Sequence, residues 1–279
     1  MQTKAANPRT TAERGAKALR VAGHFGEWLQ GRIGPEGSLA LVTVVCDPLA
    51  VEARRLGPGA LEIRQDRPVL GLSRARDFLE RIGAPEGRFS LHADMPPGGG
   101  AGASTAALLA LAAASGQRGP ALAQACLAVE GASDPLMLPN PDQVLWAPRE
   151  GRVLAAIPPL PRAEIVGGFW GAPQVTDPAD LAFPDVSDLV RRMGRGCALV
   201  DLAAIARTSA ERCTGARGPA GDPVAGLAQD LGALGYLRAH TGSARGLIFA
   251  PGTVPAHAEA ALAEAGFRET LRFCTGQRQ

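Results

Sequence analysis

The sequence predicts an α+β protein of two halves, and three observations support this. In the N-terminal half, a strand-like segment at residues 89–93 leads into a glycine-rich loop and then into a strong helix former. A stiff, proline-rich connection at residues 158–161 marks the division between the halves. Beyond it, segments typical of helices and strands alternate, as in a split βαβ, ferredoxin-like unit. We therefore expect a flexible tail at residues 1–17, an N-terminal domain at 18–161 and a C-terminal domain at 162–279.

The composition argues against several classes of protein. The 279 residues are 46% hydrophobic and carry a net charge of +2, and the basic residues are scattered rather than clustered as in nucleic-acid-binding proteins. No apolar run is long enough to span a membrane, and residues 1–20 lack the apolar core of a signal peptide. The five cysteines show no metal-ligand spacing. We expect a cytoplasmic protein without nucleic-acid or membrane partners, and the sequence leaves its oligomeric state open.

The N-terminal half is expected to begin with strands. Residues 19–33 form an apolar segment with a Gly-Glu turn, and residues 39–46 are nearly all apolar and β-branched, which is typical of a strand buried on both faces. A looser alternation around a Gly-Pro-Gly turn predicts a strand pair within residues 51–64. A short amphipathic helix at residues 74–82 then precedes the strand that leads into the glycine-rich loop.

The C-terminal half is expected to alternate between strands and helices. Residues 164–170 predict a strand, and helical spacing follows at residues 186–192, 197–207 and 227–237. The remaining expectations are a glycine-proline loop at 215–223, a small-residue turn that runs into an apolar strand within 239–250, a helix at 256–265 and a final strand at 269–274.

The loop at residues 96–106 is the most informative part of the chain. Its sequence is Pro-Pro-Gly-Gly-Gly-Ala-Gly-Ala-Ser-Thr-Ala, and clustered glycines favour a backbone that approaches a partner closely. Ser104 and Thr105 are typical of a helix N-terminus, where free amides and the helix dipole attract anions. We interpret the loop as a polyphosphate cradle; the alternative is a flexible glycine turn. It is no P-loop, because Lys4 and Lys17 are the only lysines.

Glu130 and Asp134 are the carboxylates best placed for chemistry. Glu130 lies in the last turn of a helix expected at residues 120–131, where the helix dipole disfavours a negative charge, and Asp134 follows it closely. Two carboxylates this close at a helix exit could hold Mg²⁺ and manage a proton. The alternative for Asp134 is a local cap within an Asp-Pro turn, and that for Glu27 is a turn carboxylate in solvent.

Three stretches, in this order, resemble the signatures of the GHMP kinases, the superfamily of galactokinase, homoserine kinase, mevalonate kinase and phosphomevalonate kinase. The Gly-Glu pair at residues 26–27 resembles the first signature, at the substrate site. The pattern P-x-G-x-G-x-x-x-S-T-A at residues 96–106 resembles the second, which holds the ATP phosphates, with Ala103 where a first serine is usual. The small-residue turn at residues 239–246, before an apolar strand, resembles the third.

Within that superfamily, the closest resemblance is to the L-threonine kinases of cobalamin synthesis and propanediol utilisation. The form Gly-Glu-x-x-Gln-Gly at residues 26–31 resembles that of the threonine kinases. Two positions differ: Ala22 stands where those kinases usually have Pro, and Phe25 where they usually have Cys. Their Glu-x-x-x-Asp stretch is similar to residues 130–134 with the Met-Leu-Pro segment that follows, and their His-Ser/Thr-Gly-Ser form is similar to residues 240–243.

The resemblance implies a ribosomal-S5-like N-terminal half, a ferredoxin-like C-terminal half and ATP-dependent conversion of L-threonine to O-phospho-L-threonine. It assigns the ATP phosphates to Pro97, Gly98, Gly99, Gly100, Ala101, Gly102, Ala103, Ser104 and Thr105. It assigns Mg²⁺ to Ser104 and Glu130, and proton transfer to Asp134. It assigns the substrate side to Glu27, Gln30, His240, Thr241, Gly242 and Ser243.

Two questions stay open at the level of the sequence. The roles of Glu130 and Asp134 could be exchanged, because nothing in their spacing decides which binds metal and which handles the proton. The substrate is the other question: a homoserine or sugar kinase, or a non-catalytic relative that binds ATP or a metabolite, are the alternatives to a threonine kinase.

Overall fold

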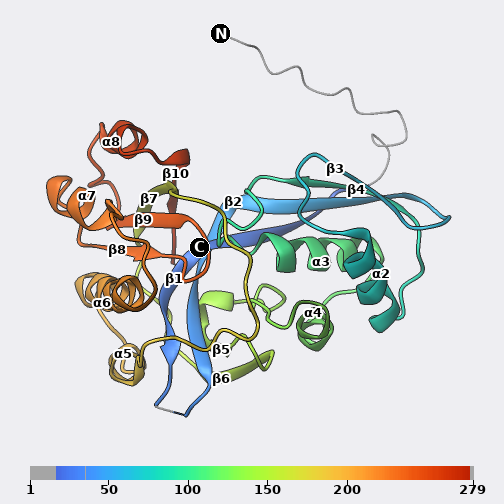
Figure 1. Cartoon of the computed structure of the whole chain (residues 1–279), viewed down its shortest axis with the longest axis horizontal. Coiled ribbons are helices and arrows are strands. Elements are labelled where there is room, and N and C mark those ends of the chain that lie inside the picture. Colours follow the sequence, from blue (N-terminus) through green and yellow to red (C-terminus); the bar gives the residue numbers. More distant parts are fainter. Residues whose placement is uncertain (1–16, 35, 277–279) are drawn as a thin grey trace, which may run out of the picture.

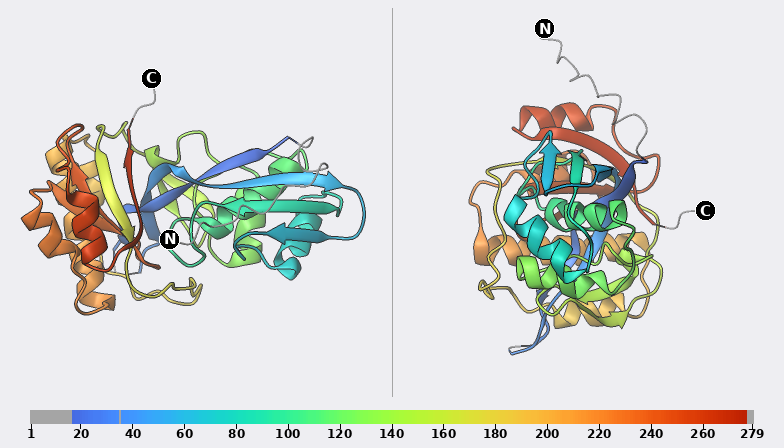
Figure 2. Two further views of the ribbon diagram at one scale, coloured as in Figure 1. Left: turned by 90° about the horizontal axis from the view of Figure 1, so that it is seen from above. Right: turned by 90° about the vertical axis from the view of Figure 1, so that its right-hand side faces the viewer.

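The computed structural model describes residues 17–34 and 36–276, so the predicted tail lies outside the described residues except for Lys17. The described residues form one ten-stranded sheet with strand order β10-β7-β9-β8-β1-β2-β4-β3, and β5 and β6 branch from it at β2 (Figure 1). The molecule is elongated, with the N-terminal half at one end and the C-terminal half at the other (Figure 2). No helix in the described ranges is both long and apolar enough to cross a bilayer.

The N-terminal half combines long strands with three helices. In chain order, its elements are β1 (Leu19–Arg32), β2 (Leu39–Gly57), β3 (Glu62–Gln65), α2 (Leu72–Arg81), β4 (Arg88–Ala93), α3 (Ala103–Ala114), α4 (Leu122–Glu130), the 3-10 turn η1 (Pro141–Gln143), β5 (Val144–Ala147) and β6 (Arg152–Ala156). The helices α2, α3 and α4 lie together on one side of the long strands (Figure 1).

Strand β2 is longer than the sequence predicts. We expected one strand at residues 39–46 and a separate pair within 51–64, but β2 runs unbroken for 19 residues. In the ladder with β1, Gly23 pairs with Cys46 and Ala22 pairs with Ala50, so residues 47–49 form a bulge. A bulge leaves its residues out of the ladder, which is where a strand tolerates a proline such as Pro48.

Helix α3 fills the space beneath β1 and β2. Its residues are almost entirely Ala and Leu, and nine of the twelve are buried, as expected of a helix that is apolar on all sides. It begins at Ala103, one residue earlier than predicted. Gly102 is the N-cap residue, with φ of 70° and no side-chain cap, so Ser104 and Thr105 lie inside the first turn rather than at the cap.

The C-terminal half has the predicted ferredoxin-like arrangement. Its elements are β7 (Glu164–Phe169), α5 (Ser187–Met193), α6 (Leu199–Arg217), α7 (Val224–Asp230), β8 (Gly235–Arg238), β9 (Ala244–Phe249), α8 (Ala258–Glu264) and β10 (Arg268–Cys274). Strands β10, β7, β9 and β8 lie in this order with every neighbouring pair antiparallel, which is the topology of a split βαβ unit.

Two boundary predictions in this half were wrong. The helix expected over residues 227–237 ends at Asp230, because Gly232 takes a left-handed conformation with φ of 65° that ends the helix, and the next residues form β8. Helix α6 runs to Arg217, into the predicted loop at residues 215–223, and ends before Gly218, whose φ is also positive at 61°.

A single apolar core joins the two halves. Phe25 of β1 packs edge to face against Phe169 of β7 and Phe273 of β10, with ring centroids 5.7 Å apart in both pairs. Gly167 makes room for this ring, since a Cβ there would lie 2.5 Å from a carbon of Phe25. The Phe25 ring is thus accommodated by a glycine in β7.

Candidate active site

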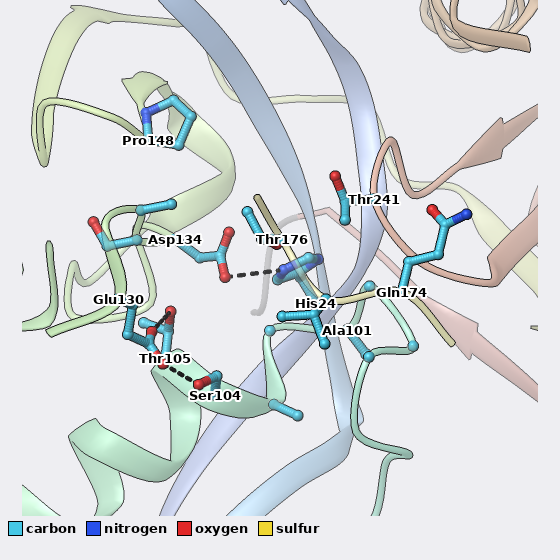
Figure 3. A pocket seen from close by; sticks show the side chains of 18 of the residues that line it. His24, Ala101, Ser104, Thr105, Glu130, Asp134, Pro148, Gln174, Thr176 and Thr241 are labelled. Atoms are coloured by element: carbon cyan, nitrogen blue, oxygen red, sulfur yellow. Dashed lines mark hydrogen bonds and ion pairs between the residues drawn. The ribbon is translucent and has the colours of Figure 1, made fainter. Parts of the chain in front are cut away.

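A cavity of about 310 Å³ lies where the glycine-rich loop, β1 and the ends of α3 and α4 meet (Figure 3). It gathers residues that are far apart in the sequence, which include all the predicted ATP-phosphate residues 97–105. Five further predicted site residues line it: Glu27, Gln30, Glu130, Asp134 and Thr241. Three predicted residues do not line it, namely His240, Gly242 and Ser243.

The glycine-rich loop is fixed in place through its carbonyl groups. The carbonyl of Gly99 accepts from the amides of Ser243 and Ala244, at 3.0 and 2.8 Å. The carbonyls of Gly100 and Ala101 accept from the amides of Gly26 and His24 in β1. Gly242 and Ser243 therefore affect the cavity indirectly, because their segment positions the glycine-rich loop and neither residue itself lines the cavity.

The amide groups of the loop are left available. Within the described part of the chain, the amides of residues 100–102 have no hydrogen-bond acceptor. The first-turn amides of α3 are free as well, since helix geometry gives them no intrahelical partner and Gly102 has no side chain to cap them. A row of unpaired N–H groups at a helix N-terminus is suited to the oxygens of a phosphate chain.

Two glycines of this loop are required by their surroundings. Gly100 has φ of 74°, and a Cβ on it would lie 2.3 Å from Cβ of Ala239 and 2.5 Å from the carbonyl oxygen of Thr241. Gly102 has φ of 70°, and a Cβ there would lie 2.6 Å from the His24 ring. The close approach that the glycines predicted is therefore present, although the partner that approaches is the protein itself.

Glu130 extends from the last turn of α4 to the first turn of α3. Ser104 Oγ donates to Glu130 Oε1, and Thr105 Oγ1 donates to Oε2 at 3.3 Å (Figure 3). Arg74 Nη1 lies 3.8 Å from Oε1. Burial raises the pKa of Glu130 to about 7, and the charge of Asp134 raises it further against the hydrogen bond from Ser104. This carboxylate lacks a strong cationic partner.

The Ser104 and Glu130 oxygens fit a magnesium ion. One hydroxyl and one carboxylate are hard oxygen donors, and Mg²⁺ is usually held by one or two such groups together with substrate phosphates. A divalent cation next to Glu130 would supply the positive charge that the buried carboxylate lacks. The free amides of the loop and this donor pair lie in the same cavity, so the residues present suit a nucleotide with its metal.

Asp134 is paired with a histidine that the sequence analysis missed. Asp134 Oδ2 lies 3.4 Å from Nε2 of His24, whose side chain is only 4% exposed (Figure 3). Burial disfavours charge on both groups, but their mutual attraction outweighs it. The pKa of Asp134 therefore lies below its ordinary value, and that of His24 lies above. An ionised Asp134 carboxylate therefore faces the cavity.

Glu27 is held from behind by His240. The His240 amide and ring Nδ1 both lie 3.2 Å from Glu27 Oε2, and the ring Nε2 lies 3.3 Å from Ser209 Oγ. Ser209 Oγ in turn accepts from the amide of Gln30 at 3.1 Å. Burial lowers the pKa of His240 despite the neighbouring Glu27. His240 lies behind the cavity wall and orients Glu27.

The segment of residues 170–186 between β7 and α5, here called the strap, borders the cavity. It contributes Gln174, Val175 and Thr176 to the lining, and the amide of Gln174 donates to the carbonyl of Gly98 at 2.9 Å. The strap and the two lining arginines, Arg74 and Arg149, were not predicted. Neither belongs to a motif, whereas His24 could have been found from its place two residues before the Gly-Glu pair.

The fold is that of the GHMP kinases. The mevalonate kinase of L. major in complex with R-mevalonate superposes with a TM-score of 0.60 over 93% of this chain and 96% of its own, at 12% identity. The Streptococcus pneumoniae phosphomevalonate kinase gives 0.59 over 94% and 99%, at 14% identity. Homoserine kinase from Cytophaga hutchinsonii gives 0.56 over 98% of each chain, at 13% identity. No protein-family model and no curated protein sequence matches the chain.

At these identities, the comparisons establish the fold. The predicted two-half α+β fold is confirmed. The narrower resemblance to the threonine kinases stays a prediction.

Proposed function

We propose that this protein is an ATP-dependent kinase of a small-molecule hydroxyl, and that its acceptor is L-threonine. The main support is the presence of two complementary features in one cavity: a glycine loop with free amides, and the Asp134 carboxylate paired with His24. The first suits a polyphosphate donor and the second suits an alcohol acceptor. We place the cavity between an N-terminal domain at residues 18–161 and a C-terminal domain at 162–279.

The nucleotide side of the cavity is assigned to the loop. Residues 97–105 would hold the ATP phosphates through backbone amides, and Ser104 and Glu130 would hold Mg²⁺. When bound, the ion neutralises charge on the phosphates that is otherwise unfavourable in transfer. This arrangement needs no lysine, because Arg74, whose Nη1 lies 3.8 Å from Glu130, supplies a positive charge to the cavity lining.

The acceptor side is assigned to Asp134 and His24. Phosphoryl transfer proceeds through a loose transition state, so the protein mainly positions the hydroxyl and receives its proton late. Asp134, kept ionised by His24, can accept a hydrogen bond from the hydroxyl and then its proton. The opposite pKa shifts of Glu130 and Asp134 support the assignment of the metal to Glu130 and of the proton to Asp134.

Threonine is favoured by the form of three segments and by the charges of the cavity. Residues 26–31, 130–139 and 240–243 have the forms typical of threonine kinases of cobalamin side-chain synthesis. Glu27, 7% exposed and at the wall, offers a carboxylate to an ammonium group. Homoserine is the second candidate, because homoserine kinases from Cytophaga hutchinsonii and Listeria monocytogenes have this fold.

The experiment is a panel of acceptors with ATP and Mg²⁺, in which ³¹P NMR identifies the phosphorylated product. We expect O-phospho-L-threonine, with L-homoserine turned over about 100-fold less efficiently because its hydroxyl lies one bond farther from the charged groups. A higher kcat/KM for homoserine or a sugar would refute the threonine assignment. If the protein neither bound ATP nor phosphorylated any acceptor of the panel, the proposed kinase function would be refuted.

A further inference from the structure

We propose that Arg149 is the anchor for a carboxylate on the acceptor, so that the enzyme phosphorylates hydroxy acids rather than neutral alcohols or sugars. This inference rests on the proposed kinase function and specifies its substrate class. Arg149 lies in the turn between β5 and β6 and lines the cavity together with Asp134 and Thr176.

Arg149 has an unsatisfied donor at the cavity. Its Nη2 donates to the carbonyl oxygen of Asp177 in the strap, at 2.9 Å. Its Nε is buried, and no acceptor for it exists among the described residues. A buried donor without a partner costs about 1–3 kcal/mol, and an acceptor on a ligand removes this cost. A carboxylate fits best, because its two oxygens match the planar fork of a guanidinium.

The charges around the cavity point to the same ligand. The lining cations other than Arg149 have carboxylate partners, since His24 pairs with Asp134 and Arg74 lies by Glu130. Within the described ranges, no carboxylate lies within ion-pair distance of Arg149. The charges of Asp180, Asp177 and Asp134 act on Arg149 from farther away, so Arg149 is the lining cation without a direct carboxylate partner among the described residues.

The local backbone fixes Arg149 relative to Asp134. The amide of Ser133 donates to the carbonyl of Pro148 at 2.9 Å, and Trp146 Nε1 donates to the carbonyl of Ser133 at 2.6 Å. The residues before Asp134 and before Arg149 are thus joined directly. A fixed spacing between the group that receives the hydroxyl and the group that binds the carboxylate selects acceptors by the number of bonds between these two functions.

The contact between Arg149 and the strap does not by itself explain the presence of an arginine at this position. Many other contacts fasten the strap, among them Gln174 to Gly98 at 2.9 Å, Arg217 to Asp180 at 2.5 Å and Arg32 to the carbonyl of Leu181 at 3.1 Å. The Asp177 contact also uses only Nη2, which leaves Nε unexplained. A phosphate of ATP is the other anion that could meet Arg149, and the experiment separates it from an acceptor carboxylate.

The test compares wild type with Arg149→Gln on matched acceptors: L-threonine with L-threoninol, and L-homoserine with L-homoserinol. Each second member lacks the carboxylate. We expect wild type to prefer the acids by about 100-fold in kcat/KM, and Arg149→Gln to lose most of this preference by losing the acids alone. Arg32→Gln is the control, since it breaks a strap contact, to the carbonyl of Leu181, and Arg32 is not among the charges that act on Arg149, so it should keep the preference.

Calorimetry of each acceptor, with a non-hydrolysable ATP analogue present, gives a readout independent of turnover. The proposal predicts weaker binding of the acids to Arg149→Gln and unchanged nucleotide affinity. Equal losses for acid and alcohol, a loss confined to the nucleotide, or no binding of any acid to wild type would overturn it. Acid-selective binding that depends on Arg149, without phosphorylation of any acceptor, would uphold the anchor and refute the proposed kinase function.

Discussion

The two sides of the cavity are constructed in different ways. The nucleotide side is one continuous segment, residues 97–105, which presents backbone amides and is pinned by its own carbonyls. The acceptor side consists of side chains from β1, from the segment after α4, from the β5–β6 turn and from the strap. A site made of backbone depends on glycine at fixed positions, whereas a site made of side chains depends on the whole fold to bring them together.

This difference predicts that changes on the two sides have separable effects, and the largest is expected for Asp134→Asn. An amide keeps the size of the carboxylate but cannot receive the proton of the hydroxyl, so kcat should fall by about 10²–10⁴ with little change in the KM for threonine. Steady-state kinetics with the preferred acceptor measure this. Near-normal turnover would mean that Asp134 handles no proton.

His24→Gln should impair the acceptor side of the cavity by changing the protonation of Asp134. Without the cation at 3.4 Å, burial of Asp134 is opposed by the hydrogen bond from Thr105 and the charge of Arg149 but no longer by His24, so the pKa of Asp134 should rise. The acid limb of the kcat profile should then move to higher pH, with a loss of about 10- to 100-fold at pH 6 that is partly recovered at pH 8. A uniform loss at every pH would indicate that His24 only packs.

Gly100→Ala should disrupt the nucleotide side alone. The added methyl meets Ala239 and the Thr241 carbonyl, so the loop must move and ATP affinity should fall more than tenfold. Gly116→Ala is a matched control, because Gly116 has a similar φ of 88° and nothing within 4 Å of an added Cβ. The two variants share the backbone strain, and only Gly100→Ala should lose ATP binding in calorimetry. Equal affinities would contradict the cradle.

The smallest effect concerns Glu130 and pH. With a pKa of about 7, raised by burial, Glu130 is mostly protonated at pH 6 and mostly ionised at pH 8 when no metal is bound. Binding of Mg²⁺ with nucleotide should therefore strengthen by up to about tenfold over this interval. Glu130→Gln should raise the Mg²⁺ requirement. It should also abolish the part of the pH dependence of Mg²⁺ binding that comes from titration of Glu130. The same pH dependence in the variant would place the metal elsewhere.

The same contrast explains what the sequence could predict. The glycine loop, α3 and the order of elements were predictable because glycine clusters, helix formers and apolar runs leave local patterns. Glu27, Glu130 and Asp134 were found through their motifs, and the structure places all three at the cavity.

Much of the rest was not predicted, because its role depends on contacts between distant parts of the chain. His24 matters through its contact with Asp134, 110 residues away by number, and Arg149 matters through a contact with the strap. His240 lies in a recognisable motif, but only the fold shows that it orients Glu27 from behind the wall. The end of α7 at Asp230, by contrast, could have been predicted from the sequence, since Gly232 is a helix stop signal.

The central claim is that the two sides of the cavity are separate, and the nucleotide affinity of Asp134→Asn tests it most directly. Titration of this variant with a non-hydrolysable ATP analogue and Mg²⁺ should give a Kd within about twofold of wild type, although turnover is lost. A drop in affinity as large as that of Gly100→Ala would contradict the account, because Asp134 would then hold the metal and the roles of the two carboxylates would be exchanged.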